Sequence, residues 1–326
     1  MDGNIVNIAG YRFVDLPDRD ELRQPFRDIC SKLNLKGTIL LSHEGINFFL
    51  AGLHESINSF IAYIEQDSRF RDITLKRSLT KYQPFNRMNV RLKKEIISIG
   101  LDHIKPAEFT GEEITPVDFK QLLDDGKEVL VLDTRNDYEC RIGTFENAME
   151  LDIKSFRDFP RAISELSDEY KDTPVVMFCT GGIRCEKAST FLKHKGFKNV
   201  YQLNGGIIEY TRQVKEKGLT SKFIGKNFVF DHRKSESISS DVISNCHQCG
   251  EKWDNHVNCA NEACHLLFIQ CKKCASLYDD CCSAECQKIN SLPIEEQKRL
   301  RKGKGNSNKI FKKGRSQVLK YKKNPS

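Results

Sequence analysis

Hydrophobic positions in the first 80 residues alternate between the two-residue period of strands and the three- to four-residue period of helices. The strand-like runs are Ile5–Val14, Thr38–Leu41, Ile46–Ala51 and a run that starts at Ile73–Leu75. The helical stripes are Leu22, Phe26, Ile29 and Leu33, then Ile57, Phe60, Ile61 and Ile64. This βαββαβ order predicts an α+β ferredoxin-like domain, placed with its connector at residues 1–112. The connector, residues 81–112, contains one further predicted strand, Val90–Ile99.

Between residues 113 and 218 the apolar runs become short and continuous, as in strands that are buried on both faces. These runs are Glu128–Leu132, Pro174–Phe178 and Val200–Leu203. Helical patterns separate them, and Thr115-Pro116 supplies an N-cap followed by proline at the first helical position. The repeated β-then-α order predicts an α/β domain, a parallel sheet with helices on both faces.

The chain after Gly218 is polar and divides into three parts by composition. Residues 219–245 are predicted to be a linker, residues 246–290 a small cysteine-rich module, and residues 291–326 a disordered tail. The tail holds 12 Lys and Arg residues against two Glu residues, a net charge of +10, whereas the whole chain carries +7. Because the positive charge lies in the tail, we expect either a polyanionic partner or a solvated segment there.

Neither the composition nor the first residues indicate a membrane or secreted protein. No run of about 18 apolar residues could span a bilayer, and the N-terminus lacks the basic segment and apolar stretch of a signal peptide. We therefore expect a cytoplasmic protein with no membrane partner. Four of the 13 cysteines are scattered over the first 245 residues, and nine fall between Cys246 and Cys286. In a reducing compartment, such closely spaced pairs favour metal sites over disulfides.

The strongest candidate for chemistry is Cys179, which directly follows the predicted strand Pro174–Phe178. The loop after it contains Gly181 and Gly182, which allow a tight turn with backbone N–H groups directed inward. These donors, the start of the next helix and Arg184 all favour a thiolate over a thiol. Ligands of open parallel sheets bind beyond the carboxyl ends of the strands, where this loop must lie. The alternative is a structural cysteine at the end of a strand.

This loop resembles the active-site loop of the rhodanese family, in which a cysteine and an arginine five residues later bracket the site. The loop residues are Cys179, Thr180, Gly181, Gly182, Ile183, Arg184 and Cys185. Cysteine phosphatases need an arginine six residues after the nucleophile. Because Cys185 holds that position here, the loop does not favour a phosphatase. Cys185 is interpreted either as a resolving thiol or as a small residue packed beneath the loop. Asp133, Arg135 and Glu139, which match the same family, are predicted to be structural ion-pair members.

Three motifs extend the resemblance over most of the chain: Lys36–Asn47, Pro84–Glu95 and Cys179–Lys187. Together they are similar to the oxygen-dependent tRNA uridine(34) hydroxylases, a family with a rhodanese domain. The resemblance implies that Cys179 is essential, as a thiolate or a persulfide, and that O2 and tRNA are substrates. It also implies 5-hydroxyuridine at the wobble position as the product. No flavin, haem or iron motif occurs in residues 1–245, so the sequence does not identify the electron donor.

A basic region surrounds the aromatic residues Tyr82 and Phe85. Its members are Arg69, Arg71, Lys76, Arg77, Lys81, Arg87, Arg91, Lys93 and Lys94. Positive side chains bind phosphates, and aromatic rings stack on unpaired bases. We therefore predict that Arg87, Arg91, Lys93 and Lys94 contact RNA. We expect no DNA partner. The alternative is a set of solvated strand faces. His43 and Glu44, between two predicted strands, lie either near the active site or in a turn.

The cysteines of the C-terminal module form pairs at the short spacing of metal ligands. Eight of them can make two tetrahedral zinc sites of four sulfurs each, which leaves no open position for catalysis. The predicted ligands are Cys246, Cys249, Cys259, Cys264, Cys271, Cys274, Cys282 and Cys286. The sequence leaves open which pairs share an ion, whether Cys281 replaces Cys282, whether His247, His256 or His265 replaces a cysteine, and whether one site or an iron–sulfur cluster forms instead.

The residues and the resemblance together predict an enzyme that hydroxylates the wobble uridine of tRNA, with Cys179 and Arg184 as catalytic residues, O2 as co-substrate and structural zinc. A sulfurtransferase that carries a persulfide on Cys179 is the alternative enzyme. A non-enzymatic RNA-binding protein would require Cys179 to be dispensable. The sequence does not define the set of tRNAs or the oligomeric state.

Overall fold

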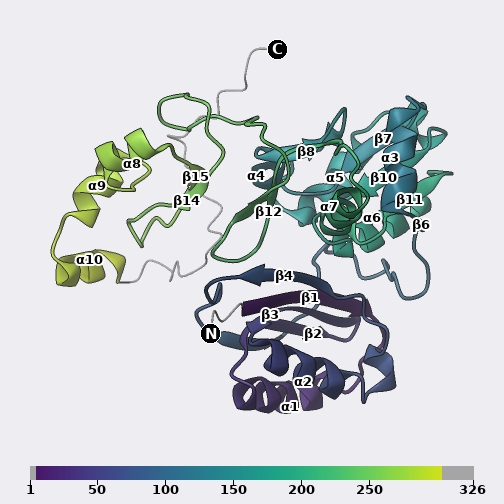
Figure 1. Ribbon diagram of the computed structural model, residues 1–326, viewed down its shortest axis with the longest axis horizontal. Helices are drawn as coiled ribbons and strands as arrows, with labels where there is room; N and C mark the ends of the chain where they lie inside the picture. The colour runs from purple at the N-terminus through teal and green to yellow at the C-terminus, as the bar shows by residue number, and fades with distance from the viewer. Residues whose placement is uncertain (1–4, 303–326) are drawn as a thin grey trace. The chain divides into compact units, whose positions relative to one another are not determined.

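The computed structural model describes residues 5–302, which form two compact units (Figure 1). The first unit comprises the chain up to Asp137 and from Phe145 to Lys222. The second comprises Tyr138–Thr144 and the chain from Phe223 onward. Among the described residues, no helix is both long and apolar enough to cross a membrane.

The N-terminal domain of the first unit is a five-stranded sheet with two helices packed on one face (Figure 1). The strands are β1 (Ile5–Phe13), β2 (Lys36–Ser42), β3 (Gly45–Gly52), β4 (Lys76–Thr80) and β5 (Met88–Leu92). The helices are α1 (Arg19–Lys32), α2 (His54–Ile64) and the 3-10 helix η1 (Ser68–Phe70). The strand order is β4-β1-β3-β2-β5, in which only β2 and β5 pair in parallel. These elements confirm the predicted ferredoxin-like arrangement, with β5 added at one edge.

Two strands differ from their predicted positions. Ile73–Leu75 is not a strand, because pairing with β1 begins only at Lys76, opposite Ala9. The predicted strand Val90–Ile99 ends at Leu92. Its later apolar residues are buried for another reason, since Ile99 packs in the hydrophobic core of the next domain without strand pairing.

The second domain of the first unit, a rhodanese-type fold, has a five-stranded parallel sheet in the order β6-β11-β10-β7-β9. Its strands are β6 (Glu112–Ile114), β7 (Leu130–Asp133), β9 (Met149–Glu150), β10 (Val175–Phe178) and β11 (Val200–Leu203). Its helices are α3 (Pro116–Asp124), α5 (Phe159–Ser164), α6 (Ile183–His194), α7 (Gly206–Glu216) and the 3-10 helices η2 (Phe156–Asp158) and η3 (Asp168–Lys171). Thr115 accepts a hydrogen bond from the Asp118 N–H as the predicted N-cap of α3.

Alternate residues of β10 show how helices cover both faces of this sheet. Val175 and Met177 pack in the core that contains the buried side chains of α5 and α6. Phe178 points to the other face, where its ring lies 4.8 Å from that of Phe145. Phe145 in turn contacts Tyr210 of α7, with ring centroids 4.7 Å apart, and α3 packs against α7. The arrangement confirms the predicted α/β domain and places α6 directly after β10.

The described residues of the second unit form small sheets and short helices. The segment around residues 137–145 forms α4 (Asp137–Cys140) and β8 (Gly143–Phe145). The later elements are β12 (Phe223–Phe228), β13 (Ser235–Ser237), β14 (His256–Asn258), β15 (Leu267–Ile269), α8 (Lys272–Tyr278), α9 (Ala284–Asn290) and α10 (Ile294–Arg301). β12 pairs with β13 and β8 in one sheet, and β14 pairs with β15.

Two expectations for this part of the chain are corrected. Residues 219–245 are not a simple linker, because they contribute two strands of a three-stranded sheet. Its apolar residue Phe228 is fully buried beside Ile142 and Ile269. The predicted disordered tail begins with a helix, α10, and its remainder from residue 303 lies outside the described residues.

Candidate functional site

Cys179 is the first residue after β10 and its side chain has no exposed surface. Gly182, with a φ of 97°, turns the backbone so that its N–H donates to the Cys179 Sγ at 3.1 Å. A φ in this range favours glycine, because a Cβ would clash with the neighbouring carbonyl. Helix α6 begins at Ile183, so the positive end of its dipole lies beside the sulfur.

The surroundings of Cys179 stabilise a thiolate. Burial by itself raises the pKa of the thiol, but a hydrogen bond from Cys185, the positive charge of Arg184 and the N–H groups of Arg184 and Gly181 outweigh it, so the pKa falls below its usual value. Burial and then the adjacent Cys179 sulfur raise the pKa of Cys185. Cys185 is fully buried, and its Sγ lies 3.8 Å from the Thr134 Oγ1. The pair therefore consists of one thiolate and one thiol that donates to it.

A second glycine turn, just before α7, holds the backbone of the Cys179 loop. The N–H groups of Ile207 and Ile208 donate to the carbonyl oxygens of Cys179 and Thr180, at 3.0 and 3.2 Å. Gly206 has a φ of 67°, and a Cβ there would lie 2.4 Å from the Cys179 carbonyl oxygen. Glycine is thus required at this approach, and the first turn of α7 fixes the loop.

Two residues of the N-terminal domain reach the same loop. The Tyr11 hydroxyl donates to the Glu186 Oε1 at 3.2 Å, and a Cβ on Gly182 would lie 2.9 Å from that hydroxyl. The Lys76 Nζ lies 4.7 Å from the centroid of the Tyr11 ring. The sequence did not single out Tyr11 or Glu186, because their contact joins positions 175 residues apart.

A polar cavity of about 330 Å³ lies near this loop: Glu186, in the first turn of α6, and Gly205 line it, whereas residues 179–185 do not. Side chains of both domains of the first unit line it, among them Tyr11, Lys76, Thr110, Glu186 and Asn204. The Glu186 carboxylate is held in place, since besides Tyr11 it accepts hydrogen bonds from Thr110 at 2.7 Å and from Gln202 at 3.2 Å. The volume is at the low end for a ligand pocket and is enough for one nucleoside.

The three motifs of the sequence meet at one buried lysine. Lys187, which is 1% exposed, forms ion pairs with Glu44 at 2.8 Å and Glu95 at 2.7 Å. Glu44 lies in the turn between β2 and β3 and also accepts the Ile96 N–H at 2.7 Å. Glu44 therefore binds Lys187 of α6 and does not line the cavity, and the Nδ1 of its neighbour His43 lies 3.3 Å from the Leu16 carbonyl oxygen. This triad joins the N-terminal domain and the connector to the helix that follows Cys179.

The predicted ion pair between Asp133 and Arg135 is confirmed as structural. Both side chains are fully buried, and the Arg135 guanidinium pairs with the Asp133 carboxylate at 2.6 Å. The guanidinium also lies 5.6 Å from the centroid of the Phe178 ring. The pair lies at the carboxyl end of β7, next to β10, the strand that leads into the Cys179 loop.

The basic region does not form one continuous surface. Lys76 lies on β4 and Arg91 on β5, at opposite edges of the first sheet, which at about 4.8 Å per strand are roughly 19 Å apart. Arg87 directly precedes β5 and is exposed, as are Arg91 and the two lysines after the strand, Lys93 and Lys94. Ion pairs already engage other members, because Arg69 binds Asp18 and Asp67, and Lys94 binds Asp102.

The lowered pKa of Cys179 gives a prediction for thiol alkylation. Cys30 is equally buried, but burial raises its pKa to about 12. Thiolates are the reactive form, so iodoacetamide should modify Cys179 before Cys30 or Cys140. As the pH falls below 8, the alkylation rate of Cys179 should stay nearly constant, whereas that of an ordinary thiol should fall about tenfold per pH unit. Peptide mass spectrometry measures each rate, and labelling of Cys30 or Cys140 with Cys179 untouched would contradict the activated loop.

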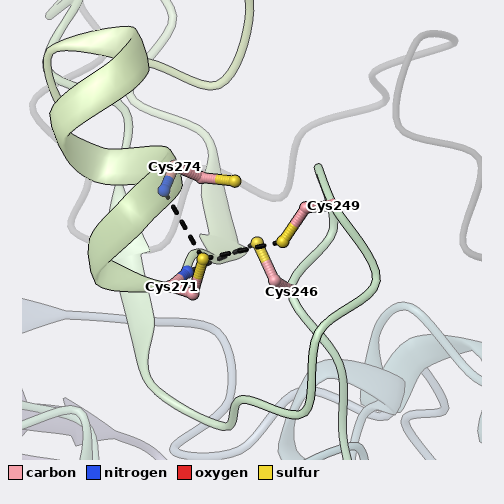
Figure 2. A group of neighbouring side chains, drawn as sticks. All are labelled: Cys246, Cys249, Cys271 and Cys274. Carbon is pink, nitrogen blue, oxygen red and sulfur yellow. Dashed lines mark hydrogen bonds between the residues drawn. The ribbon is translucent and has the colours of Figure 1, made fainter.

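Four cysteines of the second unit form the first candidate metal centre. Cys246, Cys249, Cys271 and Cys274 have sulfur atoms that all lie within 4.8 Å of one another. Figure 2 shows two of them on a loop and two at the start of α8, with their side chains directed toward one another. The Cys249 and Cys271 sulfurs are 3.6 Å apart, and the Cys271 N–H donates to the Cys246 Sγ at 3.3 Å.

The second group consists of Cys259, Cys264, Cys282 and Cys286, also within 4.8 Å of one another. The Cys282 sulfur lies 3.7 Å from both the Cys264 and the Cys286 sulfur. Cys281 is outside the group, where it is fully buried against the apolar residues of this module. The cysteine pairs therefore alternate along the chain. Cys246 and Cys249 group with Cys271 and Cys274, whereas the pair between them, Cys259 and Cys264, groups with Cys282 and Cys286.

Each of the two cysteine groups has the geometry to bind one tetrahedral metal ion. With metal–sulfur bonds of about 2.3 Å, the sulfurs of a tetrahedral zinc site lie about 3.8 Å apart, close to the 3.6 and 3.7 Å between these cysteines. Backbone N–H groups that donate to the sulfurs, as Cys282 does to the Cys259 Sγ at 3.4 Å, stabilise the thiolates that such an ion requires. Sulfurs this close leave no room for a cluster of several irons between them.

Family models match three parts of the chain. They are a UPF0176 acylphosphatase-like domain at residues 5–96, a rhodanese-like domain at residues 115–213 and a "Rhodanase C-terminal" segment at residues 224–287.

Proteins named tRNA uridine(34) hydroxylase are similar over nearly the whole chain. The one from Enterobacter sp. (strain 638) is 40% identical over 317 residues, which cover 96% of this chain and 90% of the relative. The protein from Escherichia fergusonii is 42% identical over a match that covers 95% of this chain and 89% of the relative. That from Leptospira interrogans serogroup Icterohaemorrhagiae is also 42% identical and covers 94% and 84%.

Proposed function

Because this chain belongs to the tRNA uridine(34) hydroxylase family, we propose that it hydroxylates the wobble uridine of tRNA to 5-hydroxyuridine. The observation that carries this proposal is the thiolate of Cys179, buried behind a loop that Tyr11, Lys76 and Gly205 of the cavity lining approach. Family membership supplies the substrate, and the geometry supplies a place where a base that has left its stack can meet the thiolate. A tRNA substrate also implies that the protein acts in the cytoplasm.

In this proposal Cys179 is the nucleophile and Arg184 stabilises its anion. A thiolate can add to C6 of uracil, which makes C5 electron-rich and open to oxidation. The C5 carbanion formed in this way bonds to one oxygen atom of O2, and the O–O bond is then cleaved. Loss of the C5 proton and release of the thiolate from C6 restore the C5=C6 double bond. The oxygen comes from O2, and a two-electron donor external to the chain is needed to reduce the second oxygen atom to water. Because Cys179 is fully buried, the base gains access only when the loop or Tyr11 moves.

The test is mass spectrometry of nucleosides from tRNA incubated with the purified protein. The proposal predicts hydroxylated uridine at position 34 in air and none without O2. The alternative, a sulfurtransferase, would release sulfur to a small thiophile from a donor such as thiosulfate, without O2 or tRNA. Full modification under anaerobic conditions would exclude the hydroxylase and favour the sulfurtransferase.

We also propose that the exposed edge beside β5 binds the phosphates of tRNA. Replacement of both Arg87 and Arg91 by Glu should weaken tRNA binding and reduce the slope of log affinity against log salt by about 1.4, since each lost phosphate contact removes roughly 0.7 in single-stranded RNA. Fluorescence anisotropy at several salt concentrations measures the slope.

The control for this charge reversal is Lys195→Glu with Lys198→Glu, which carries the same charge change. Both residues lie after the C-terminal end of α6, whereas the Cys179 loop is at its N-terminal end. We expect the control pair to leave the slope unchanged. Equal slopes for both double variants and the wild type would show that the β5 edge does not contact tRNA.

For the two cysteine groups we propose zinc as the bound ion, with a structural role. Four sulfur ligands close the coordination shell, so neither ion has an open position for O2 or a base. The chemistry that zinc would supply is the cross-linking of loops that have little apolar core of their own. The interleaved pairs would then tie both sites into one module.

A further inference from the structure

Two lysines lie next to the Cys179 site, and their surroundings differ. Lys187 is fully buried and neutralised by two carboxylates, Glu44 and Glu95, as expected of a structural lysine. Lys76 lines the polar cavity, and within residues 5–302 it takes part in no ion pair. Lys76 is half-buried, and Glu186 and Glu113 of the same cavity lining act on it electrostatically without forming an ion pair. Its ammonium can therefore donate a hydrogen bond to a ligand in the cavity.

The position of Lys76 is defined by both domains of the first unit. Its ammonium lies over the Tyr11 ring, 4.7 Å from the centroid, an arrangement that stabilises a cation. Its Cε would lie 3.9 Å from a Cβ on Gly181, so the side chain follows the Cys179 loop. Burial lowers the pKa of Lys76, and the negative charges of Cys179 and Glu186 oppose that effect. These contacts hold a hydrogen-bond donor in the lining of the cavity, next to the loop that carries the thiolate.

We propose that Lys76 is a substrate-binding residue of the Cys179 site, and that its ammonium donates a hydrogen bond to a carbonyl oxygen of the uracil base in the cavity. This inference rests on the proposed function, which makes uracil the reacting base. Uracil offers two carbonyl oxygens as acceptors, and a cation beside either one also stabilises the negative charge that addition at C6 places on the ring. The N-terminal domain thereby completes the active site of the rhodanese domain.

The experiment compares Lys76→Met, Lys76→Arg and the matched control Arg77→Met in the full-length protein. Arg77 is the next residue of β4, lies on the opposite face of the strand and is exposed. Arg77→Met therefore removes one positive charge, as Lys76→Met does, but away from the cavity. The first readout is the rate of uridine hydroxylation. The second is protection of Cys179 from iodoacetamide by an anticodon stem-loop RNA, with U34 or with an abasic nucleotide at position 34.

We expect Lys76→Met to lower kcat/KM at least about 100-fold, as for other donors that stabilise developing charge, with Lys76→Arg intermediate and Arg77→Met near wild type. The U34 RNA should protect Cys179 in the wild type and in Arg77→Met, the abasic RNA should not, and Lys76→Met should abolish the difference. Protection is expressed relative to each variant's own unprotected rate, because loss of the Lys76 charge also slows alkylation.

The two readouts separate this inference from the proposed function. Protection that depends on both U34 and Lys76, in a protein that makes no hydroxyuridine, would reject the hydroxylase and support the base-binding role. Hydroxylation and protection in Lys76→Met equal to those in Arg77→Met would overturn the inference and leave the proposed function intact. Equal protection by U34 and abasic RNA in the wild type would show that no base enters the cavity.

Discussion

Replacement of Cys179 by serine is expected to lower the formation of hydroxyuridine at least about 1,000-fold, because a serine hydroxyl is not ionised at neutral pH in this loop. The loop is built around a sulfur anion, which accepts the Gly182 N–H at 3.1 Å and lies beside the Arg184 charge. A neutral hydroxyl keeps the shape of the loop and removes the nucleophile. The product is measured by nucleoside mass spectrometry.

The same substitution should change the free energy of unfolding by no more than about 1 kcal/mol, since it removes no packing volume beyond one sulfur atom. Cys30→Ala, which also alters a fully buried cysteine but lies in the N-terminal core, serves as the control and should keep its activity. Hydroxyuridine formed by Cys179→Ser at a tenth of the wild-type rate or more would exclude a catalytic thiolate.

Removal of metal is expected to unfold residues 246–286 while the first unit stays folded. Two of the hydrophobic clusters of this module consist largely of the cysteines themselves, and its other apolar residues, Leu267 and Ile269, pack on Phe228 outside the module. We therefore expect its folding to depend on the proposed ions, since a structural zinc ion contributes on the order of 10–16 kcal/mol at neutral pH. Elemental analysis should find close to two zinc ions per chain, and hydrogen exchange after chelation should rise in this module alone.

Adjacent cysteines provide the control for this prediction. Cys282→Ala removes a member of the second group and should lower the metal content by one ion, whereas Cys281→Ala should leave it unchanged. Metal near zero in protein purified under reducing conditions, or unchanged exchange after chelation, would refute the zinc module. The reverse result for the two variants would show that Cys281 is the ligand.

Local patterns were enough to predict the main elements and the loop chemistry. The period-2 and helical stripes of the first 80 residues give the order of β1 to α2, and the apolar runs before Cys179 and at Val200–Leu203 give the parallel strands. The residue types at Cys179, Gly182 and Arg184 already indicated a thiolate, because their effects act over one turn of the chain. The family resemblance is confirmed by relatives of about 40% identity.

Contacts between distant segments could not be predicted in this way. The apolar residues up to Ile99 predicted a longer strand, but the burial of Ile99 reflects packing in the core of the next domain. Likewise, the basic residues of β4 and those of β5 are near one another in sequence but lie at two different edges of a sheet, because β1, β3 and β2 separate the two strands. The pairing of the cysteines also depends on how the chain returns on itself, and only the structure places Cys282 and not Cys281 in the second group.

The motifs themselves gained a physical meaning from the structure. Glu44, Glu95 and Lys187 belong to three separate motifs, and only Glu44 was considered for a role of its own, yet the three residues form a single ion triad. Such a triad fixes the N-terminal domain against α6, which begins at the Cys179 loop. That attachment is what brings Tyr11 and Lys76 to the cavity.

The most direct test of the central claim follows the oxygen atom itself. Purified protein is incubated with tRNA that lacks the modification, under isotopically labelled O2 in ordinary water, and the nucleosides are analysed by mass spectrometry. The account predicts that uridine 34 gains one labelled oxygen, and that Cys179→Ser forms no product. Label derived from water, or thiolated product without any hydroxyuridine, would contradict it.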